Sequence, residues 1–225
     1  MIFEIDNIEL NFSGRNVLNG IYLKAETGKV TGLLGTNGSG KSCLFELFFG
    51  SMKAKYKLVR VDSNPLTKPL FKTKKVKFLP QFNFIPNSVK LSVVFELYKV
   101  NWESFVTVFE SFIPYRNSKF KELSGGERRI LETYLVIKSD SEFILLDEPF
   151  SHLSPININL FKRLIAEEKK NKAVVITDHM YNHIIDTSDD IYLLKNGTTK
   201  LIKNLEELEM YRYISEGSLG QTANA

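Results

Sequence analysis

The segment Gly35-Thr-Asn-Gly-Ser-Gly-Lys41-Ser42 has the residue types and spacing, G-x-x-x-x-G-K-[ST], that cradle a polyphosphate. Glycines let the backbone approach the phosphates closely, and the amide N–H groups at a helix N-terminus face their negative charge. Lys41 is placed to reach the β- and γ-phosphates, and the Ser42 hydroxyl to coordinate Mg²⁺. Because the segment follows an expected strand and opens an expected helix over 41–49, it predicts a nucleotide site.

Two adjacent carboxylates, Asp147 and Glu148, stand at the end of the apolar run Phe143-Ile-Leu-Leu. Successive strand residues point to opposite sides, so the two acids can do different work. Asp147 is expected to hold Mg²⁺, directly or through water, and Glu148 to aim at an attacking water. Two acids after a strand are more often a solvated loop or a helix cap. Combined with a phosphate loop, they indicate a site that hydrolyses a nucleotide.

A third motif is Leu123-Ser-Gly-Gly-Glu127, in which Ser124 and Glu127 have the spacing of a capping box. Taken as local structure, it predicts the well-capped start of a helix with an apolar stripe. The N-terminus of such a helix also leaves amide N–H groups that can receive a phosphate. The residues alone allow both interpretations.

The rest of the sequence alternates between strand and helix patterns that would position these motifs. Alternating apolar residues near the N-terminus indicate antiparallel strands, and later continuous apolar runs indicate buried parallel strands. Asn196-Gly197 is a strong hairpin signal, and apolar steps of three or four from 91 to 113 predict two short helices ended by Pro114. The expected strands cover 2–12, 21–26, 28–35, 142–147, 173–177 and 191–202, and further helices cover 127–137, 160–170 and 204–214.

These elements predict an α/β fold with a mixed sheet core, an antiparallel β subdomain and a helical subdomain. We expect a single domain over residues 1–210, with the helical insert at about 83–140. Residues 211–225 are expected to form a C-terminal tail that is partly disordered.

Composition narrows the class of protein. The chain has 225 residues, a net charge of +4 and one cysteine, Cys43, which excludes an intramolecular disulfide scaffold. No run approaches the about 18 apolar residues of a membrane-spanning helix, and the N-terminal residues are not typical of a signal peptide.

Residues 53–77 carry nine basic side chains and one acid. This block could contact nucleic acid or anionic lipid, but a solvated loop face is the favoured interpretation.

In order and separation, the phosphate loop, Leu123-Ser-Gly-Gly-Glu127, the FILLDEP segment and a histidine after a short strand resemble the ATP-binding-cassette (ABC) ATPases. The resemblance covers residues from about 2 to about 205 and implies a P-loop NTPase fold of the ABC type. It also implies that two subunits clamp two ATP molecules head to tail, each ATP lying between one phosphate loop and the opposing Ser124.

The resemblance assigns roles residue by residue. Phe12 matches the aromatic residue that stacks on adenine, and Gln81 matches the glutamine that senses Mg²⁺ and the γ-phosphate. His179 matches the switch histidine and Glu148 the general base, so the catalytic set is Glu148, His179, Gln81 and Lys41. Mg²⁺ is assigned to Ser42, Gln81 and Asp147. The residues assigned to ATP are Phe12, Gly35, Asn37, Gly38, Ser39, Gly40, Lys41, Ser42, Cys43, Ser124, Gly125, Gly126 and Glu127.

The function implied is that of the ATP-binding and ATP-hydrolysing subunit of an ABC transporter. Such a subunit works as a homodimer, or as a pseudo-dimer with another ABC ATPase subunit, beneath a separate transmembrane permease subunit. The expected location is cytoplasmic, peripheral at the inner face of the membrane, and no nucleic acid partner is expected. Phe82, Phe84 and Ile85 would then line the groove for the permease. The alternative is a soluble ABC ATPase that drives a cytoplasmic assembly, such as an iron–sulfur scaffold.

One position departs from the family pattern. The family usually shows Ser-x-Leu-Asp after the second carboxylate, and this chain has Ser151-His-Leu-Ser154. In the family that acid helps to couple the two ATP sites, and Ser154 lacks the charge-assisted part of its hydrogen bonds. We therefore expect slower or less cooperative hydrolysis. A weaker interpretation on the same residue is a regulatory protein that barely hydrolyses ATP.

Overall fold

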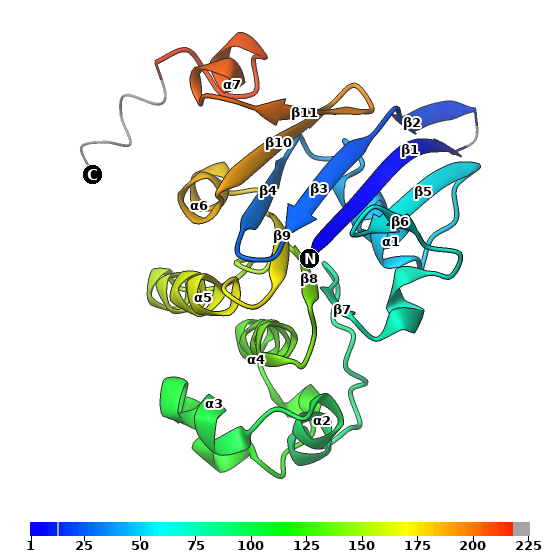
Figure 1. Cartoon of the computed structure of the whole chain (residues 1–225). Helices are drawn as coiled ribbons and strands as arrows, with labels where there is room; N and C mark the ends of the chain where they lie inside the picture. The colour runs from blue at the N-terminus through cyan, green and yellow to red at the C-terminus, as the bar shows by residue number, and fades with distance from the viewer. Residues whose placement is uncertain (13, 218–225) are drawn as a thin grey trace.

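Two β-sheets and a set of helices make up the fold in the computed structural model, which describes residues 1–12 and 14–217 (Figure 1). The strands are β1 (Ile2–Phe12), β2 (Arg15–Asn19), β3 (Tyr22–Glu26), β4 (Val30–Leu34), β5 (Tyr56–Val61), β6 (Asn64–Pro65), β7 (Val76–Leu79), β8 (Phe143–Asp147), β9 (Ala173–Thr177), β10 (Asp190–Lys195) and β11 (Thr198–Ile202). The α-helices are α1 (Lys41–Phe49), α2 (Leu91–Tyr98), α3 (Trp102–Val108), α4 (Gly125–Lys138), α5 (Pro155–Glu168), α6 (Tyr181–Thr187) and α7 (Glu206–Met210). The 3₁₀ helices are η1 (Leu70–Thr73), η2 (Glu110–Tyr115) and η3 (Phe120–Glu122).

Within these described residues, no helix is both long and apolar enough to cross a bilayer. The last eight residues of the expected C-terminal tail, 218–225, lie outside the described residues.

β1 is the centre of the smaller sheet, in which every pair of strands is antiparallel. The order is β2-β1-β5-β6, and β3 also pairs with β1. β1 buries Phe3 and Ile5 and then Ile8 and Leu10, so its alternation shifts by one residue at Asn7. Asn7 has a φ of 51° and lies where the pairing with β5 changes register, as an extra residue in a strand requires. The antiparallel pairing predicted for the N-terminal strands is confirmed.

The larger sheet has six strands in the order β11-β10-β4-β9-β8-β7. β10, β4, β9, β8 and β7 are parallel to their neighbours, whereas β11 is antiparallel to β10. The β10–β11 turn has Asn196 and Gly197 at φ values of 51° and 76°, which a two-residue type I′ turn requires. The predicted mixed sheet and hairpin are therefore confirmed.

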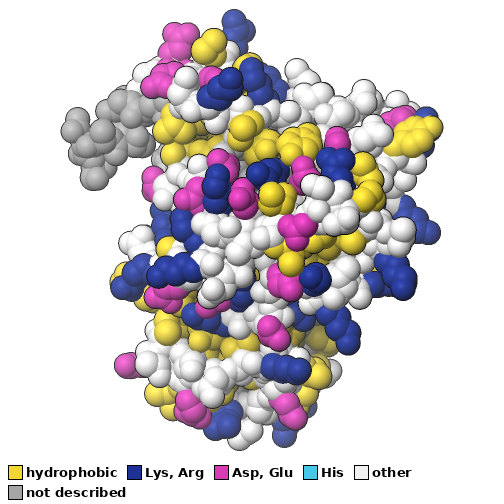
Figure 2. Space-filling model, viewed as in Figure 1, with side chains coloured by type: hydrophobic (Ala, Val, Ile, Leu, Met, Phe, Trp, Pro, Cys, Tyr) yellow, Lys and Arg dark blue, Asp and Glu magenta, His cyan; other side chains and the backbone are white. Residues whose placement is uncertain are grey.

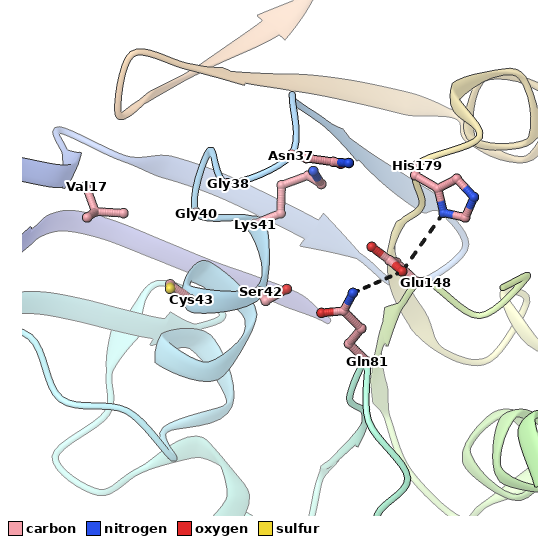
Figure 3. Close-up of a pocket in the computed structure, with 10 residues that line it drawn as sticks. All are labelled: Val17, Asn37, Gly38, Gly40, Lys41, Ser42, Cys43, Gln81, Glu148 and His179. Carbon is pink, nitrogen blue, oxygen red and sulfur yellow. Dashed lines mark hydrogen bonds and ion pairs between the residues drawn. The ribbon is translucent and has the colours of Figure 1, made fainter. Parts of the chain in front are cut away.

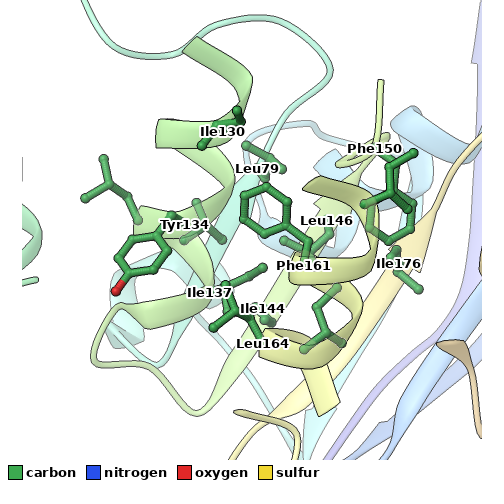
Figure 4. Close-up of a cluster of buried hydrophobic side chains, with 14 of the residues drawn as sticks. Leu79, Ile130, Tyr134, Ile137, Ile144, Leu146, Phe150, Phe161, Leu164 and Ile176 are labelled. Atoms are coloured by element: carbon green, nitrogen blue, oxygen red, sulfur yellow. The ribbon is translucent and has the colours of Figure 1, made fainter. Parts of the chain in front are cut away.

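Both faces of this sheet are covered, which explains why its central strands are apolar without alternation. In β8, Ile144 and Leu146 join the cluster formed with helices such as α4 and α5, shown in Figure 4. Phe143 and Leu145 join a second cluster formed with α1 and the smaller sheet. Because the strands are held on both sides, the loops at their carboxyl ends have a rigid base.

In the helical region after β7, the position of Pro114 relative to the helices differs from the prediction. The sequence predicted two short helices ended by this proline, but the structure has α2, α3 and then η2, with Pro114 inside η2. A short 3₁₀ segment accepts proline because few of its N–H groups need a helical partner. The aromatic residues of this region that recur at steps of three or four lie in the core, where the Phe105 ring packs against the rings of Trp102, Phe109 and Tyr134.

The basic segment 53–77 lies in part along the right-hand edge of the molecule in Figure 2. Much of its charge is used within the protein. Three of its basic side chains form ion pairs: Lys55 with Glu9, Lys75 with Glu142, and Arg60 with Glu4 and Asp6. Lys57 donates hydrogen bonds to backbone carbonyl oxygens, and the Lys77 ammonium lies over the Tyr98 ring. These partners give structural roles to about half of the block.

Candidate nucleotide site

The phosphate loop leaves β4 and enters α1, as the sequence predicted. Gly38 and Gly40 have φ values of 76° and 105°, which side-chain-bearing residues rarely adopt. The loop opens onto a cleft of ≈ 630 Å³ shown in Figure 3. The cleft is lined by Val17, Asn37, Gly38, Gly40, Lys41, Ser42, Cys43, Gln81, Glu148 and His179.

Lys41 lies buried at the base of the cleft, with 8% of its surface exposed. Its Nζ donates to the carbonyl oxygens of Gly35 at 2.8 Å and Thr36 at 3.2 Å. Burial lowers the pKa of Lys41, while the carboxylates of Asp147, Glu148 and Asp178 favour its charged form. A phosphate entering the cleft would offer the ammonium a stronger partner than two neutral carbonyls.

Ser39 also supports an anionic ligand. Its Oγ is buried and has no hydrogen-bond partner among the residues that the structure describes. It lines a second cavity of ≈ 460 Å³ beside the first, together with Asn16, Val17, Thr36, Asn37, Gly38, Asn196 and Gly197. An unpaired buried hydroxyl costs free energy unless a ligand supplies the missing partner. The two cavities share Val17, Asn37 and Gly38, so they form one extended region around the loop.

Asp147 ends β8 beneath this loop and is almost fully buried. Burial raises its pKa to about 6, and a hydrogen bond with Ser42 opposes that shift. A cation at this place would favour the ionised carboxylate. The Ser42 hydroxyl, the Asp147 carboxylate and the Gln81 side-chain oxygen are the kind of ligand that Mg²⁺ prefers. The residues present therefore fit a Mg²⁺ ion.

Glu148 is the centre of the site's polar contacts. Its Oε2 accepts from Gln81 Nε2 and from Ser151 Oγ, both at 3.2 Å, and lies 3.9 Å from His179 Nδ1. In Figure 3 the side chains of Gln81 and His179 both point toward it. Its φ is 53°, an uncommon backbone conformation for a residue with a side chain, and its N–H donates to Thr177 O at 2.8 Å. β8, β9 and the segment after β7 together hold this carboxylate at the cleft.

Three residues that support the site were not identified from the sequence. Asp178 is buried, lies 3.2 Å from His179 Nδ1 and accepts from two backbone N–H groups, so it can orient the imidazole. Arg129 of α4 donates to the carbonyl oxygens of Pro80, Asp147 and Glu148, and Ser151 donates to Glu148. Asp178 precedes His179 at a strand end, which is a usable signal, whereas Arg129 stands unmarked in an amphipathic helix.

The capping box is confirmed. Ser124 Oγ accepts from Glu127 N at 3.3 Å, and Glu127 Oε2 accepts from Ser124 N at 2.7 Å. These two residues and the glycines between them, Gly125 and Gly126, do not line the cleft around Lys41. Ser124 and Gly125 are exposed, and a Cβ added at Gly125 would meet open space. This helix end therefore presents free backbone to the outside of the chain.

Three further residues assigned from the sequence are Cys43, Gly35 and Phe12. Cys43 lines the cleft on the side toward Val17, and burial raises the pKa of its thiol (Figure 3). Gly35 does not line the cleft, although its carbonyl oxygen holds Lys41. Phe12 ends β1, and its side chain lies outside the described part of the chain.

The exposure of the loop after Gln81 corrects one expectation about a partner groove. Phe82 is 79% exposed, but Ile85 is buried in the core and Phe84 packs against Tyr98 at a ring distance of 5.9 Å. Ile85 and, in part, Phe84 pack into the core, and Glu132 of α4 accepts hydrogen bonds from the backbone N–H groups of both. Phe82 is therefore the residue of the three that stays free to meet a partner.

Ser154→Asp tests the departure from the Ser-x-Leu-Asp pattern. Ser154 caps α5, with its Oγ accepting from Asn157 N at 3.4 Å, and aspartate is an equally good N-cap. We expect unchanged stability and a rise in turnover or in the Hill coefficient, with turnover up to about fivefold higher, the effect of about 1 kcal/mol on a barrier. Steady-state ATPase assays and denaturant unfolding measure both.

The control for this prediction is Ser154→Ala, which removes the cap and should cost about 1 kcal/mol without raising turnover. If Ser154→Asp changes neither turnover nor the Hill coefficient, the coupling role given to this position is wrong.

Comparison with known proteins gives a consistent result. The family model described as ABC transporter matches residues 18–151, which include the phosphate loop, Gln81, the capping box and both carboxylates. A probable ABC transporter ATP-binding protein of Azorhizobium caulinodans is 30% identical over 202 residues, covering 84% of this chain and 72% of that protein. The lipopolysaccharide export system ATP-binding protein LptB of Haemophilus influenzae is 26% identical over 229 residues, covering 92% and 95%.

Solved structures agree on the fold. The structure of an ATP-binding subunit of an ABC transporter aligns with a TM-score of 0.81 at 18% identity, covering 99% of this chain and 98% of that one. A bacterial Atm1-family ABC exporter with ATP bound aligns with a TM-score of 0.82 at 15% identity, covering 100% of this chain and 42% of that one.

Proposed function

This chain belongs to the ABC transporter family and is an ATP-binding, ATP-hydrolysing subunit, and from that premise we propose how its residues perform the reaction. The observation that carries the proposal is the Glu148 carboxylate, held at the cleft by Gln81 and Ser151. We propose that Glu148 is the general base, taking a proton from a water placed between it and the γ-phosphate. Gln81 and His179 position that water and the phosphate.

The remaining residues of the cleft bind and orient ATP. The phosphate-loop amides, Ser39 and Lys41 hold the β- and γ-phosphates, and most of the rate comes from this positioning and from charge stabilisation. Ser42, Gln81 and Asp147 would hold Mg²⁺, which supplies positive charge to the phosphate oxygens when bound. His179, kept in place by Asp178, completes the set facing the γ-phosphate.

Proteins of this family dimerise, and we propose that this chain forms a homodimer or a pseudo-dimer with another ABC ATPase subunit. The exposed N-terminus of α4 supports the proposal. Ser124, Gly125, Gly126 and Glu127 do not line the chain's own cleft. The capping box uses the N–H groups of Ser124 and Glu127, so the N–H groups of Gly125 and Gly126 are the ones that suit the ATP bound to a second subunit. Each ATP would then be held by both subunits, and hydrolysis would release them.

We further propose a transmembrane permease subunit as the partner, with this subunit on the cytoplasmic side of the membrane. The exposed Phe82 follows Gln81 directly, so a partner that binds this side chain touches the loop that contacts Glu148. A large exposed aromatic residue is a suitable anchor for a protein contact. The relatives named as transporter subunits favour this partner over a soluble assembly scaffold.

Affinity co-purification from detergent-solubilised membranes tests this partner. We expect tagged wild-type protein to recover a polytopic membrane protein, identified by mass spectrometry, and Phe82→Asp to lose up to about 90% of it, the loss of about 1.4 kcal/mol at a single anchor. The matched control is Met210→Asp on α7, because Met210 is 77% exposed and Phe82 is 79% exposed. The control should recover the partner at the wild-type level.

Two results would contradict the transporter assignment of the partner. Recovery of soluble proteins without any membrane protein would favour the alternative of a soluble ABC ATPase that drives a cytoplasmic assembly. Equal loss in Phe82→Asp and Met210→Asp would mean that exposed apolar surface in general, and not the loop after Gln81, holds the recovered protein.

A further inference from the structure

Glu132 is a charged residue in the middle of α4 with none of its surface exposed. Its Oε1 accepts hydrogen bonds from two successive backbone N–H groups, Phe84 N at 2.8 Å and Ile85 N at 3.1 Å. Burial raises the pKa of Glu132, and the two N–H groups oppose that shift. The two hydrogen bonds link the loop that follows Gln81 to α4 and offset part of the cost of burying this side chain.

Arg129 donates a hydrogen bond to the backbone on the other side of Gln81, at Pro80. It lies three residues before Glu132, so both side chains leave neighbouring positions on one face of α4. Its Nη1 donates to Pro80 O at 2.8 Å, and its guanidinium also donates to the carbonyl oxygens of Asp147 and Glu148. Gln81 therefore stands between a backbone carbonyl held by Arg129 and two backbone N–H groups held by Glu132.

We propose that Glu132 is a positioning residue for ATP hydrolysis, which ties the loop 82–85 to α4 and thereby keeps Gln81 against Glu148. Ser124 caps the N-terminus of α4, so a change at that end is carried to the loop through this bond. The inference rests on the roles proposed for Gln81 and Glu148. On this proposal the loop 82–85 and α4 move together, and Phe82 is the exposed side chain of the pair.

The choice of variants follows from the acceptor atom. Glu132→Gln keeps a carbonyl oxygen for both N–H groups, whereas Glu132→Met keeps the length of the side chain and removes the acceptor. Glu132 Oε2 has no partner among the described residues, so no hydrogen bond is broken when the amide nitrogen of glutamine replaces that oxygen. Thr133→Val is the matched control, because Thr133 is the next residue of α4, equally buried, and its Oγ1 also lacks a partner there.

The first measurement is hydrogen exchange of the Phe84 and Ile85 amides by NMR, without nucleotide. In Glu132→Met we expect exchange to accelerate about 10- to 100-fold at these two amides, because removing the acceptor leaves two buried N–H groups without a partner. Glu132→Gln and Thr133→Val should stay within about threefold of wild type. The second measurement is steady-state ATPase, where Glu132→Met should lower kcat about tenfold with KM for ATP within about twofold, and Glu132→Gln should restore kcat.

Unchanged exchange at both amides in Glu132→Met would overturn the proposal, as would equal loss of kcat in the glutamine and methionine variants, which would indicate a packing role. A rise of KM at constant kcat would also contradict it, because Gln81 would then affect ATP binding alone. The exchange experiment needs no ATP. If wild-type protein failed to hydrolyse ATP, the proposed function would fail while the role of Glu132 in holding the loop was still decided.

Discussion

Glu148→Gln is expected to lower kcat for ATP hydrolysis at least about 100-fold while ATP still binds. Glutamine has nearly the same size and keeps an oxygen that can accept from Gln81 and Ser151, which now donate to Oε2 at 3.2 Å. The local geometry should therefore survive, and the loss comes from the missing base. Phosphate release measures turnover, and nucleotide titration measures binding.

The same variant should accumulate as an ATP-bound dimer. Removing one negative charge beside the γ-phosphate favours the bound state, and without hydrolysis the dimer has no route to reopen. Size-exclusion chromatography with Mg²⁺-ATP should show the dimer for Glu148→Gln and a mixture for wild type.

The matched control for this prediction is Glu142→Gln. Glu142 directly precedes the opposite end of β8 and pairs with Lys75 at 2.9 Å on the surface, so the variant removes one charge far from the cleft. Its kcat should equal that of wild type. If Glu148→Gln keeps kcat within about threefold of wild type, another group activates the water and the central role given to Glu148 is wrong.

Local sequence patterns predicted much of the fold, because turn residues and apolar runs determine where these helices and strands begin and end. The helix 41–49 was predicted with its observed bounds since a glycine-rich turn and a glycine at residue 50 delimit it. The continuous apolar runs marked β8 and β9 because both faces of these strands are buried. Pro114 was predicted as a helix end and lies inside η2, because a 3₁₀ turn has little need of the missing N–H.

The motifs and the family resemblance assigned every residue that lines the cleft except Val17, but not the residues that hold them in place. Gln81, Glu148 and His179 come from three separate segments, and the structure brings them to one place. Arg129 and Glu132 act on backbone atoms of distant residues, and a carbonyl or N–H group leaves no trace in the sequence. Phe84 and Ile85 were expected in a partner groove because the sequence does not show their packing: Ile85 is buried and Phe84 is partly buried against the core.

Lys41→Met is expected to weaken ATP binding about 100-fold, the loss of one charge-assisted contact to phosphate in a buried site. The variant should fold, because methionine matches the length of the side chain and removes the desolvation cost of the buried ammonium, which lowers the pKa of Lys41. Thermal unfolding without nucleotide is expected to be unchanged or shifted upward, which separates lost binding from lost folding.

Stabilisation by ATP measures the lost affinity. At an ATP concentration of 100 times the wild-type Kd, wild type should gain about 2.7 kcal/mol, and a variant with a hundredfold larger Kd about 0.4 kcal/mol. Lys57→Met is the matched control. Lys57 Nζ also donates to two backbone carbonyls, Leu47 O at 3.0 Å and Met52 O at 3.4 Å, and burial likewise lowers its pKa. It lies beyond the other end of α1, away from the cleft, so Lys57→Met should keep the full gain with ATP. Equal gains in Lys41→Met and Lys57→Met would mean that Lys41 serves the loop's own structure, through Gly35 and Thr36, and not the phosphates.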